Sequence, residues 1–342
     1  MRLSPPAVWC LLVISVLSSM GCARGLLRLG PASADVVSKP VSLCPPNKNV
    51  QQIGRLAYRG GVVLTWPGRT FGGWSDLAIT QQGQNLLAIS DEGHWLSARL
   101  NWSNAGLTAL HDGRLGVLPG EDCPGKLACD SESFALMPDG WLVGFERKDR
   151  LRLFAYTDPP FAQAARAFAL PPGLHGGGND GLETLAGLPD GRLLAIAEGP
   201  ETGDPHGVAA WIWQAGAWKE TEYPTVPWFR PTGASWLEPD PMGGDRVVVV
   251  ERYWRLGQSR SRIVQLRVPP AKEALPVSLQ VQELAQLAEP ESVDNFEGIT
   301  AWEQGGERRI ALLSDDNFQG SQRTLLMTFA VVGESKKDTC RL

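Results

Sequence analysis

The 342-residue chain is 43% hydrophobic and 20% charged, with a formal net charge of −5, and it is long enough to bury a full core. Its 38 Gly, 26 Pro and 13 Trp favour many turns and pleated, half-buried surfaces over long helices. The mild acidity, without a basic stripe, argues against nucleic acid as a partner, because nothing would neutralise the phosphates.

The first segment, residues 1–21, has the pattern of an export signal. Arg2 supplies a short positive region, and the apolar run Ala7–Met20 that follows is too short for a membrane span. Two alternative cleavage sites fit the sequence. Small residues before Cys22 are typical of a bacterial lipoprotein signal, which would lipidate Cys22, whereas Ala32–Ala34 matches an A-x-A site. Both export the protein, so we expect a periplasmic or envelope-anchored location, with membrane contact only through such an anchor.

Residues 22–50, rich in Pro, Ser and Ala, are predicted to be a linker, and residues 51–342 to form one domain. Four cysteines follow the signal, and an even number in an oxidising compartment indicates disulfides. Cys123 and Cys129 flank a short Pro-Gly loop and are predicted to pair. Cys44 and Cys340 would then join the two ends of the domain.

One pattern recurs about every 50 residues, which is the period of β-propeller blades. Two apolar runs flank a turn, as around Pro189–Gly191, and this predicts a β-hairpin. The near-continuous runs Leu86–Ile89 and Val247–Val250 suit inner strands that are buried on both faces. The hairpins begin at five places: Asp76, Glu132, Glu183, Gly233 and Glu297.

The predicted fold is therefore all-β, a propeller of five or six blades with its ends closed together. A sixth, degenerate blade would lie in Leu107–Leu118, and Gly61–Trp66 would complete the last blade by pairing with the C-terminal strands. Two packed all-β domains are the structural alternative. We expect a monomer.

Acidic residues mark the open ends of these hairpins. The first residue of strand one and the last residue of strand two are carboxylates at nearly every such position, as in the pairs Asp76 with Asp91 and Glu297 with Asp315. Corresponding positions of all blades meet around a propeller axis, so these groups should crowd together and raise one another's pKa unless something neutralises them.

Two neutralising partners are available in the sequence. Hard cations such as Ca²⁺ take six to eight oxygen ligands in flexible geometry, whereas few His argue against zinc. Arg147 and Arg252, which directly follow Glu146 and Glu251, are the alternative. Equally, repeated acids can serve only as locks between blades. The candidate metal ligands are Asp76, Asp91, Glu132, Glu183, Glu297, Asp315 and Asp316.

Several motifs together resemble the phytase-like family, also described as having esterase-like activity of phytase. The most specific are Asp294–Ile299 and Ser314–Phe318. Softer matches are Gly72–Asp76, Ser90–Gly93, Phe145–Arg147, Asn179–Glu183 and Gln322–Leu326, so that the resemblance runs from about Gly61 to Phe329. It implies a bacterial exported propeller, a phosphoester or ester hydrolase role, and Ca²⁺ ions that neutralise acidic ligands and substrate phosphates.

The leading hypothesis is a Ca²⁺-dependent hydrolase of phosphate or other esters that acts on a small anionic or ester substrate. Glu183, Glu297 and Asp315 would carry the catalytic chemistry, and Arg147, Arg252 and Arg323 would bind the substrate. The rival from another class is a non-catalytic envelope propeller that binds a ligand or a protein and uses its acids to hold the blades together.

Overall fold

The computed structural model describes residues 32–34, 36–68, 70–119, 123, 129–174, 181–199, 207–255, 257–333 and 340. All of them belong to one compact unit, Pro31–Leu342. The expected signal at 1–21, Cys22 and the motif residues Asn179 and Asp180 lie outside these ranges. Every named element within them is a strand, and no helix there is long and apolar enough to cross a membrane.

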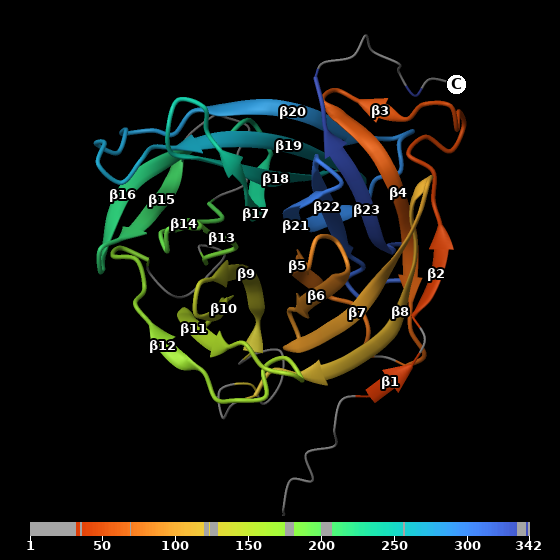
Figure 1. The fold of residues 1–342 in the computed structure, drawn as a ribbon, viewed down its shortest axis with the longest axis horizontal. Coiled ribbons are helices and arrows are strands. Elements are labelled where there is room, and N and C mark those ends of the chain that lie inside the picture. The colour runs from red at the N-terminus through yellow and green to blue at the C-terminus, as the bar shows by residue number, and fades with distance from the viewer. Residues whose placement is uncertain are drawn as a thin grey trace, which may run out of the picture. The chain divides into compact units, whose positions relative to one another are not determined.

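Within the described residues the strands form five four-stranded antiparallel blades around a common axis (Figure 1). The chain is therefore an all-β propeller. The strands of blades 1 to 3 are β5 (Trp74–Thr80), β6 (Asn85–Ser90), β7 (His94–Ser103), β8 (Gly106–Val117); β9 (Ser131–Met137), β10 (Gly140–Phe145), β11 (Arg150–Ala155), β12 (Arg166–Phe168); and β13 (Thr184–Gly187), β14 (Leu193–Ile196), β15 (Gly207–Gln214), β16 (Ala217–Pro224).

Blade 4 and blade 5 complete the ring. Their strands are β17 (Arg230–Pro239), β18 (Asp245–Arg255), β19 (Gln258–Val268), β20 (Val281–Ala288); and β21 (Asn295–Gln304), β22 (Glu307–Asp315), β23 (Thr324–Val331), β4 (Leu56–Thr65). Three short strands lie outside the blades: β1 (Ala32–Ala34) pairs with β8, and β2 (Val37–Pro40) and β3 (Gln52–Ile53) pair with β4.

The N-terminal strand β4 closes the ring by pairing with the C-terminal strand β23, for example Leu64 with Thr324. This confirms the closure predicted for Gly61–Trp66. The expectation of a sixth blade in Leu107–Leu118 was wrong, because β8 is the outer strand of blade 1 and meets β4 through one residue pair, Gly60 and Leu107. Residues 36–50, expected within the linker, include β2 and the fully buried Leu43.

Both expected disulfides are present, Cys44–Cys340 and Cys123–Cys129. The first joins residues that are 296 positions apart in the sequence and reinforces the strand closure at blade 5. Disulfides persist in oxidising compartments, which favours a location outside the cytoplasm.

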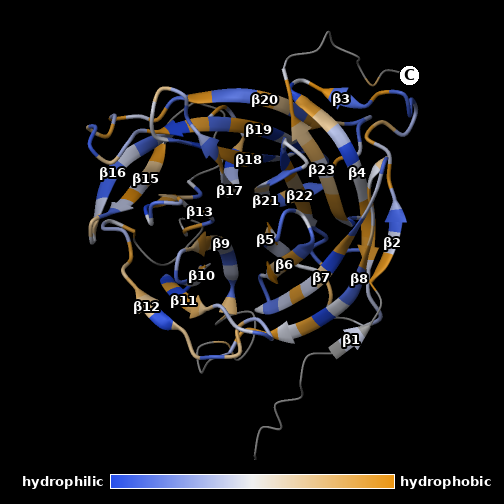
Figure 2. Ribbon diagram, viewed as in Figure 1, coloured by the Kyte–Doolittle hydropathy of each residue, from blue (hydrophilic) through white to orange (hydrophobic). Residues whose placement is uncertain are grey.

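The apolar runs of the second strands, next to the inner ones, are buried on both faces, and alternate residues contact different neighbouring blades. In β6, Leu86 and Ala88 pack toward blade 5, whereas Leu87 and Ile89 pack toward blade 2. A pleated strand points successive side chains to opposite faces, so a continuous apolar run fills two interfaces at once. Figure 2 shows the other pattern, with hydrophobic and hydrophilic bands alternating along the outer strands β7 and β8.

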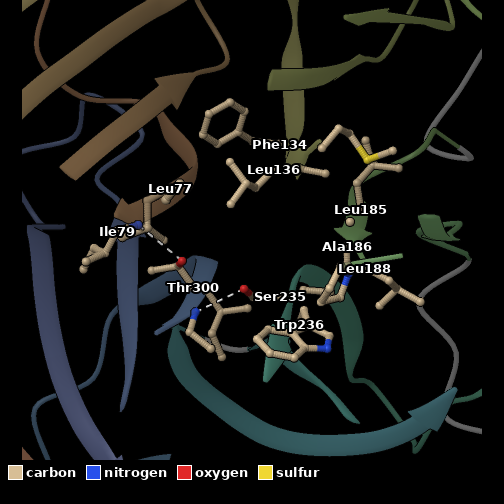
Figure 3. A pocket seen from close by; sticks show the side chains of 18 of the residues that line it. Leu77, Ile79, Phe134, Leu136, Leu185, Ala186, Leu188, Ser235, Trp236 and Thr300 are labelled. Carbon is tan, nitrogen blue, oxygen red and sulfur yellow. Dashed lines mark hydrogen bonds between the residues drawn. The ribbon is translucent and has the colours of Figure 1, made fainter. Parts of the chain in front are cut away.

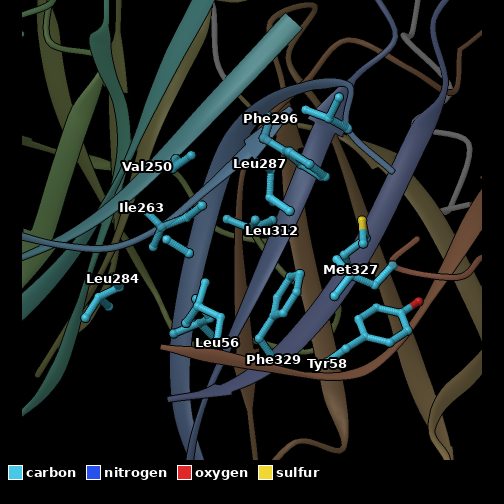
Figure 4. Packing of buried hydrophobic residues seen from close by; sticks show 14 of the residues in the cluster. Leu56, Tyr58, Val250, Ile263, Leu284, Leu287, Phe296, Leu312, Met327 and Phe329 are labelled. Carbon is cyan, nitrogen blue, oxygen red and sulfur yellow. The ribbon is translucent and has the colours of Figure 1, made fainter. Parts of the chain in front are cut away.

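Five apolar clusters result, one between each pair of adjacent blades in the described part of the chain. In Figure 4, Val250 and Ile263 of blade 4 face Phe296, Leu312 and Phe329 of blade 5. Each blade is thereby held by its two neighbours, and the blades hold one another at fixed positions around the axis.

The axial channel is narrow where the inner strands of blades 1, 4 and 5 approach one another. A Cβ atom on Gly298 would lie 2.8 Å from the Asp76 Cα, and one on Gly233 would lie 2.5 Å from the Glu297 carbonyl oxygen. Neither position has room for a side chain, so glycine is required there by close approach of the backbones. We call this level, defined by Asp76, Gly233 and Gly298, the waist of the channel.

Asp76 joins three blades at the waist. Its fully buried carboxylate accepts N–H bonds from Leu77 at 2.8 Å, from Phe134 of blade 2 at 3.1 Å, and from Ile299 of blade 5. Burial nevertheless raises the pKa of Asp76 well above its usual range, with these N–H bonds partly opposing the rise. Asp76 therefore acts as a lock between blades.

We expect loss of the Cys44–Cys340 disulfide to destabilise the protein more than loss of Cys123–Cys129. A cross-link that closes a longer loop restricts the unfolded chain more, and the two sequence separations are 296 and 6. Guanidinium unfolding of Cys44→Ser/Cys340→Ser should show a loss of about 2–5 kcal/mol. Equal losses in Cys123→Ser/Cys129→Ser would contradict this explanation.

Asp76→Asn should lower the free energy of unfolding by about 2–3 kcal/mol, because an amide leaves at least one buried backbone N–H without an acceptor. Urea unfolding measures the loss. The control is Asp139→Asn, an Asp that pairs with Arg166 and has a 71% exposed side chain. We expect the control to change stability by less than about 0.5 kcal/mol. If Asp76→Asn loses no more stability than Asp139→Asn, then Asp76 does not stabilise the contacts between blades.

Candidate functional site

A β-bulge lies near the start of the inner strand in four of the five blades. The ladder between inner strand and second strand shifts register there, leaving one residue unpaired in each: Ser75, Glu132, Thr232 and Glu297. In blade 3 the equivalent residue is Glu183, which directly precedes β13. A bulge re-aims the side chain of its extra residue, and here all five converge on one cavity.

This cavity, the acidic cavity, has a volume of about 140 Å³. Two further acids enter it from the ends of second strands, Asp91 after β6 and Asp315 at the end of β22. Arg252 of β18 is the cation that lines it. The complete lining is Ser75, Asp91, Glu132, Glu183, Thr232, Arg252, Glu297, Asp315 and Asn317.

Burial and mutual repulsion raise the pKa of these carboxyl groups. For Glu132 burial is the main cause, followed by the charges of Glu183 and Glu297. Burial raises the pKa of Asp315 to about 8, with the charge of Glu297 as the next cause. The charged forms of these groups are therefore disfavoured unless a positive charge compensates them.

Glu297 is held by two hydrogen-bond donors. The Arg252 guanidinium donates to its Oε1 at 2.7 Å, and the Asn295 amide donates to the same oxygen at 2.8 Å. The pKa of Glu297 is raised by burial, and Arg252 and then Asn295 partly oppose the rise. Asn295 therefore fixes the orientation of Glu297 beside the only cation that lines the acidic cavity among the described residues.

The cavity lining fits a hard cation. All its ligand atoms are oxygens, from carboxylates, hydroxyls and the Asn317 amide, and hard cations prefer such ligands. Ser75 adds an independent observation. It is only 2% exposed and lines the cavity, yet its hydroxyl has no hydrogen-bond partner among the described residues. A buried polar atom without a partner is rare and points to a group that binds there.

Neighbouring carboxylates form two further groups whose oxygens lie within 4.8 Å of one another. Asp130, Glu132 and Glu146 make the first, and Glu146, Glu183 and Glu198 make the second. Glu146 belongs to both, and burial, followed by the charge of Asp130, raises its pKa to about 7. The acidic region therefore extends from the cavity toward blades 2 and 3 and offers enough oxygens for a metal ion.

The structure brings five of the seven candidate metal ligands to the cavity, namely Asp91, Glu132, Glu183, Glu297 and Asp315. It does not bring Asp76 or Asp316 there. Asp76 lies one position past the bulge and faces the waist. The Asp316 carboxylate accepts N–H bonds from Gly73 and Phe318 and a hydroxyl bond from Thr324 at 3.1 Å, so it organises a loop.

Of the three arginines expected to bind substrate, Arg252 alone lines the cavity. Arg147 pairs with Asp130, and Arg323 pairs with Asp294 at 3.1 Å. Glu251, which ends the fourth hairpin, is also elsewhere, since its buried carboxylate accepts bonds from Tyr223 and Arg262.

Sequence reasoning missed Ser75 and Thr232 as cavity residues. An alignment of the hairpins on their acids selects Asp76, because this Asp matches the acids of other blades, and it selects Gly233 at the equivalent position. Both residues lie one position past the bulge. A polar residue directly before each of those two positions was the available signal.

The family profile described as "Phytase-like: Esterase-like activity of phytase" matches residues 69–318. No curated protein matches the chain.

Among solved structures, the chain is similar to the PQQ-bound aldose sugar dehydrogenase of Streptomyces coelicolor, at 15% identity, 79% coverage of this chain, 98% coverage of that chain and a TM-score of 0.39. It is also similar to XC5397 of Xanthomonas campestris, titled a gluconolactonase, at 11% identity, 89% and 99% coverage and a TM-score of 0.38. AofleA from Arthrobotrys oligospora is similar at 11% identity, 89% coverage of both chains and a TM-score of 0.43.

The family match spans four blades in full and the inner half of blade 5, and it includes every residue that lines the acidic cavity. The chain therefore belongs to the Phytase-like family.

Proposed function

We propose that the protein is a Ca²⁺-dependent hydrolase of phosphate or other esters, with its active site at the acidic cavity. The observation that carries the proposal is the convergence on one cavity, which also contains an arginine, of the bulged residues of four blades and of Glu183 at the equivalent position of blade 3. Repeated bulges at the same position favour a site over a set of unrelated structural contacts.

Asp91, Glu132, Glu183, Glu297 and Asp315 are the proposed carboxylate ligands, and Ser75 with its unpartnered hydroxyl is the proposed neutral one. A set of oxygens from flexible carboxylates and hydroxyls suits Ca²⁺ better than Zn²⁺, which prefers nitrogen and sulfur ligands in tetrahedral geometry. When bound, the cation supplies charge neutralisation, polarisation of an ester oxygen and a lowered pKa of water.

The chain's own groups divide the remaining tasks. Arg252 can bind an anionic ester oxygen, since its guanidinium offers several donors and already lines the cavity. Glu183 and Asp315 are the proposed proton acceptors, because burial and neighbouring charges raise the pKa of both groups, that of Asp315 to about 8. Glu297 positions Arg252 through their 2.7 Å bond.

The substrate is proposed to be small, because the cavity measures about 140 Å³. Arg147 and Arg323, although paired with acids, are proposed to lie on the approach to the cavity and to attract anionic substrates. We further propose a periplasmic or envelope-anchored monomer, with Cys22 as the lipid anchor if the lipoprotein signal is used.

The second candidate is a non-catalytic propeller in which the acids only hold blades together. It is favoured by Asp76 and by the ion pair of Glu198 with Arg230, in which buried carboxylates join blades. The acidic cavity differs from these inter-blade contacts, since the hydroxyl of Ser75 has no hydrogen-bond partner among the residues that the structure describes. Turnover and metal binding therefore decide between the two candidates.

Glu297→Gln should weaken Ca²⁺ binding by at least about tenfold and lower ester turnover by about 100-fold or more, because it removes a ligand charge and the partner of Arg252. Calorimetry with Ca²⁺ and hydrolysis of p-nitrophenyl phosphate and p-nitrophenyl acetate, with and without chelator, measure the two effects.

The matched control is Glu303→Gln on the same strand, whose side chain is 57% exposed and lies at the opposite end of β21. It should leave both quantities unchanged. Ca²⁺ binding without any turnover would support the non-catalytic candidate. Absence of both would defeat the proposal.

In chelator, the free energy of unfolding should fall as the pH rises. The pKa of Asp315 is about 8 in the folded protein and about 4 when unfolded, so its protonated form stabilises the fold. That contribution is fully present below about pH 4 and is lost as the pH rises through about 8. Ca²⁺ should restore stability most at high pH, where it no longer competes with protons.

Urea unfolding at several pH values, with chelator or with excess Ca²⁺, measures this difference. Asp315→Asn should flatten the pH dependence seen in chelator. A Ca²⁺ effect that is the same at pH 6 and pH 8.5 would mean that the ion does not bind at these carboxylates.

A further inference from the structure

A second cavity, the apolar cavity, lies along the same inner strands as the acidic cavity. Its volume is about 430 Å³, and all five inner strands contribute to its wall (Figure 3). Along β5, Ser75 lines the acidic cavity, whereas Leu77, Ala78 and Ile79 line the apolar one. Asp76 lies between these two sets, at the waist.

The waist lies between the two cavities, one of which is acidic and the other apolar. Gly233 and Gly298 have no side chains there, and the space is taken up by close backbones and the buried carboxylate of Asp76. That carboxylate already accepts N–H bonds from blades 1, 2 and 5. None of the residues that line one cavity lines the other.

The apolar cavity has no Asp, Glu, Lys, Arg or His in its lining among the described residues. Its wall is built mainly from Leu, Ile, Ala, Met, Pro and Phe, with Leu136, Leu185 and Trp236 among the labelled side chains in Figure 3. The cavity therefore offers no counter-charge to an ionic ligand, and burying an unpaired charge is strongly unfavourable.

The polar side chains of the wall are already engaged by the fold. The Thr300 hydroxyl accepts the Ile79 N–H at 3.3 Å, and the Ser235 hydroxyl accepts the Ala301 N–H at 3.1 Å, as the dashed lines in Figure 3 show. The Trp236 indole donates to Asp245 at 2.8 Å. The Tyr156 hydroxyl, also in the wall, donates to the Met137 carbonyl. The protons of the Ser235 and Thr300 hydroxyls can be donated to a neutral oxygen of a ligand.

The wall also includes apolar side chains that water reaches. Leu136 is 49% exposed and Tyr156 is 47% exposed, and both line the cavity from blade 2. Half-exposed apolar groups next to a concave apolar wall gain hydrophobic stabilisation when a ligand covers them. Pockets that bind small molecules typically have volumes of about 300–1,000 Å³ and mainly apolar walls with few polar groups.

We propose that the apolar cavity binds an uncharged, largely apolar small molecule, at a site separate from the acidic cavity. A small molecule fits better than a protein surface, because the wall is concave and is formed by inner strands from all five blades. The absence of ionisable groups from its described lining selects against charged molecules. This site depends on neither the metal ion nor the hydrolysis proposed above.

Two fluorescent probes that share one ring system test the proposal. N-phenyl-1-naphthylamine is neutral, and 1-anilinonaphthalene-8-sulfonate has the same rings with an added sulfonate. We expect saturable binding of the neutral probe at one molecule per chain, with the sulfonate at least about tenfold weaker because its charge would be buried without a partner. Chelator should leave the binding of the neutral probe unchanged.

Leu136→Asp should weaken binding of the neutral probe at least about tenfold, because it places a charge on the wall. The matched control is Leu170→Asp, a Leu that is 39% exposed and does not line the cavity, and we expect it to bind the probe as the unmodified protein does. Both variants should keep Ca²⁺ binding at the acidic cavity. Circular dichroism checks that each is folded.

Three results would overturn the proposal: no saturable binding of the neutral probe, equal binding of the sulfonate, or equal affinities of Leu136→Asp and Leu170→Asp. If Leu136→Asp does not fold, the comparison of the two probes on the unmodified protein still decides. Loss of probe binding on chelation would assign the probe to the acidic cavity instead.

Discussion

The structure depends on packing each blade against its two neighbours. The second strand of each blade carries a continuous apolar run that fills the clusters on both of its sides. In β14, Leu193 and Ala195 face blade 2, while Leu194 and Ile196 face blade 4. Pairing of β4 with β23 and the Cys44–Cys340 disulfide remove the free edge that an open array would leave. Only a closed ring places the same position of every blade near one axis. Both cavities form there, because each is lined by residues from all five blades.

Convergence brings like charges together, which is unfavourable by itself. The pKa values of Glu132, Glu183, Glu297 and Asp315 are all raised, with burial the largest cause for each. Arg252 opposes this for Glu183 and Glu297, but a single guanidinium does not balance five carboxylates. A fold that needed these acids only as locks would pair them individually, as it pairs Glu251 with Arg262 and Glu198 with Arg230. The excess of carboxylates over cations is therefore the physical reason for proposing a cation in the cavity.

Much of the fold was predictable from the sequence, because a hairpin repeat and two-faced apolar runs are local patterns. Closure of the ends was also predictable, from an apolar run before the first repeat and an even number of cysteines. Which positions of the different blades are equivalent was not predictable. A bulge adds one residue to a strand without a sequence signature of its own, so an alignment on acids selected Asp76 and Gly233 in place of Ser75 and Thr232. The prediction of a sixth blade was wrong for a related reason. The outer strand β8 has an apolar pattern that does not belong to the hairpin repeat, so the sequence predicts a separate blade there.

The same one-residue shift separates the chemistry of the two ends of the channel. The bulged residue Glu297 and its equivalents face the acidic cavity, whereas Ile299 and its equivalents, two positions further along each strand, face the apolar one. Between them, the equivalent positions are Asp76, Ser133, Thr184, Gly233 and Gly298, which are small or bound to neighbouring backbone. A bulge re-aims the side chain of its extra residue, and in these strands that residue enters the acidic cavity two positions before the residue that lines the apolar one. The acids of the cavity and the apolar residues that pack the blades together are therefore different residues of the same strands.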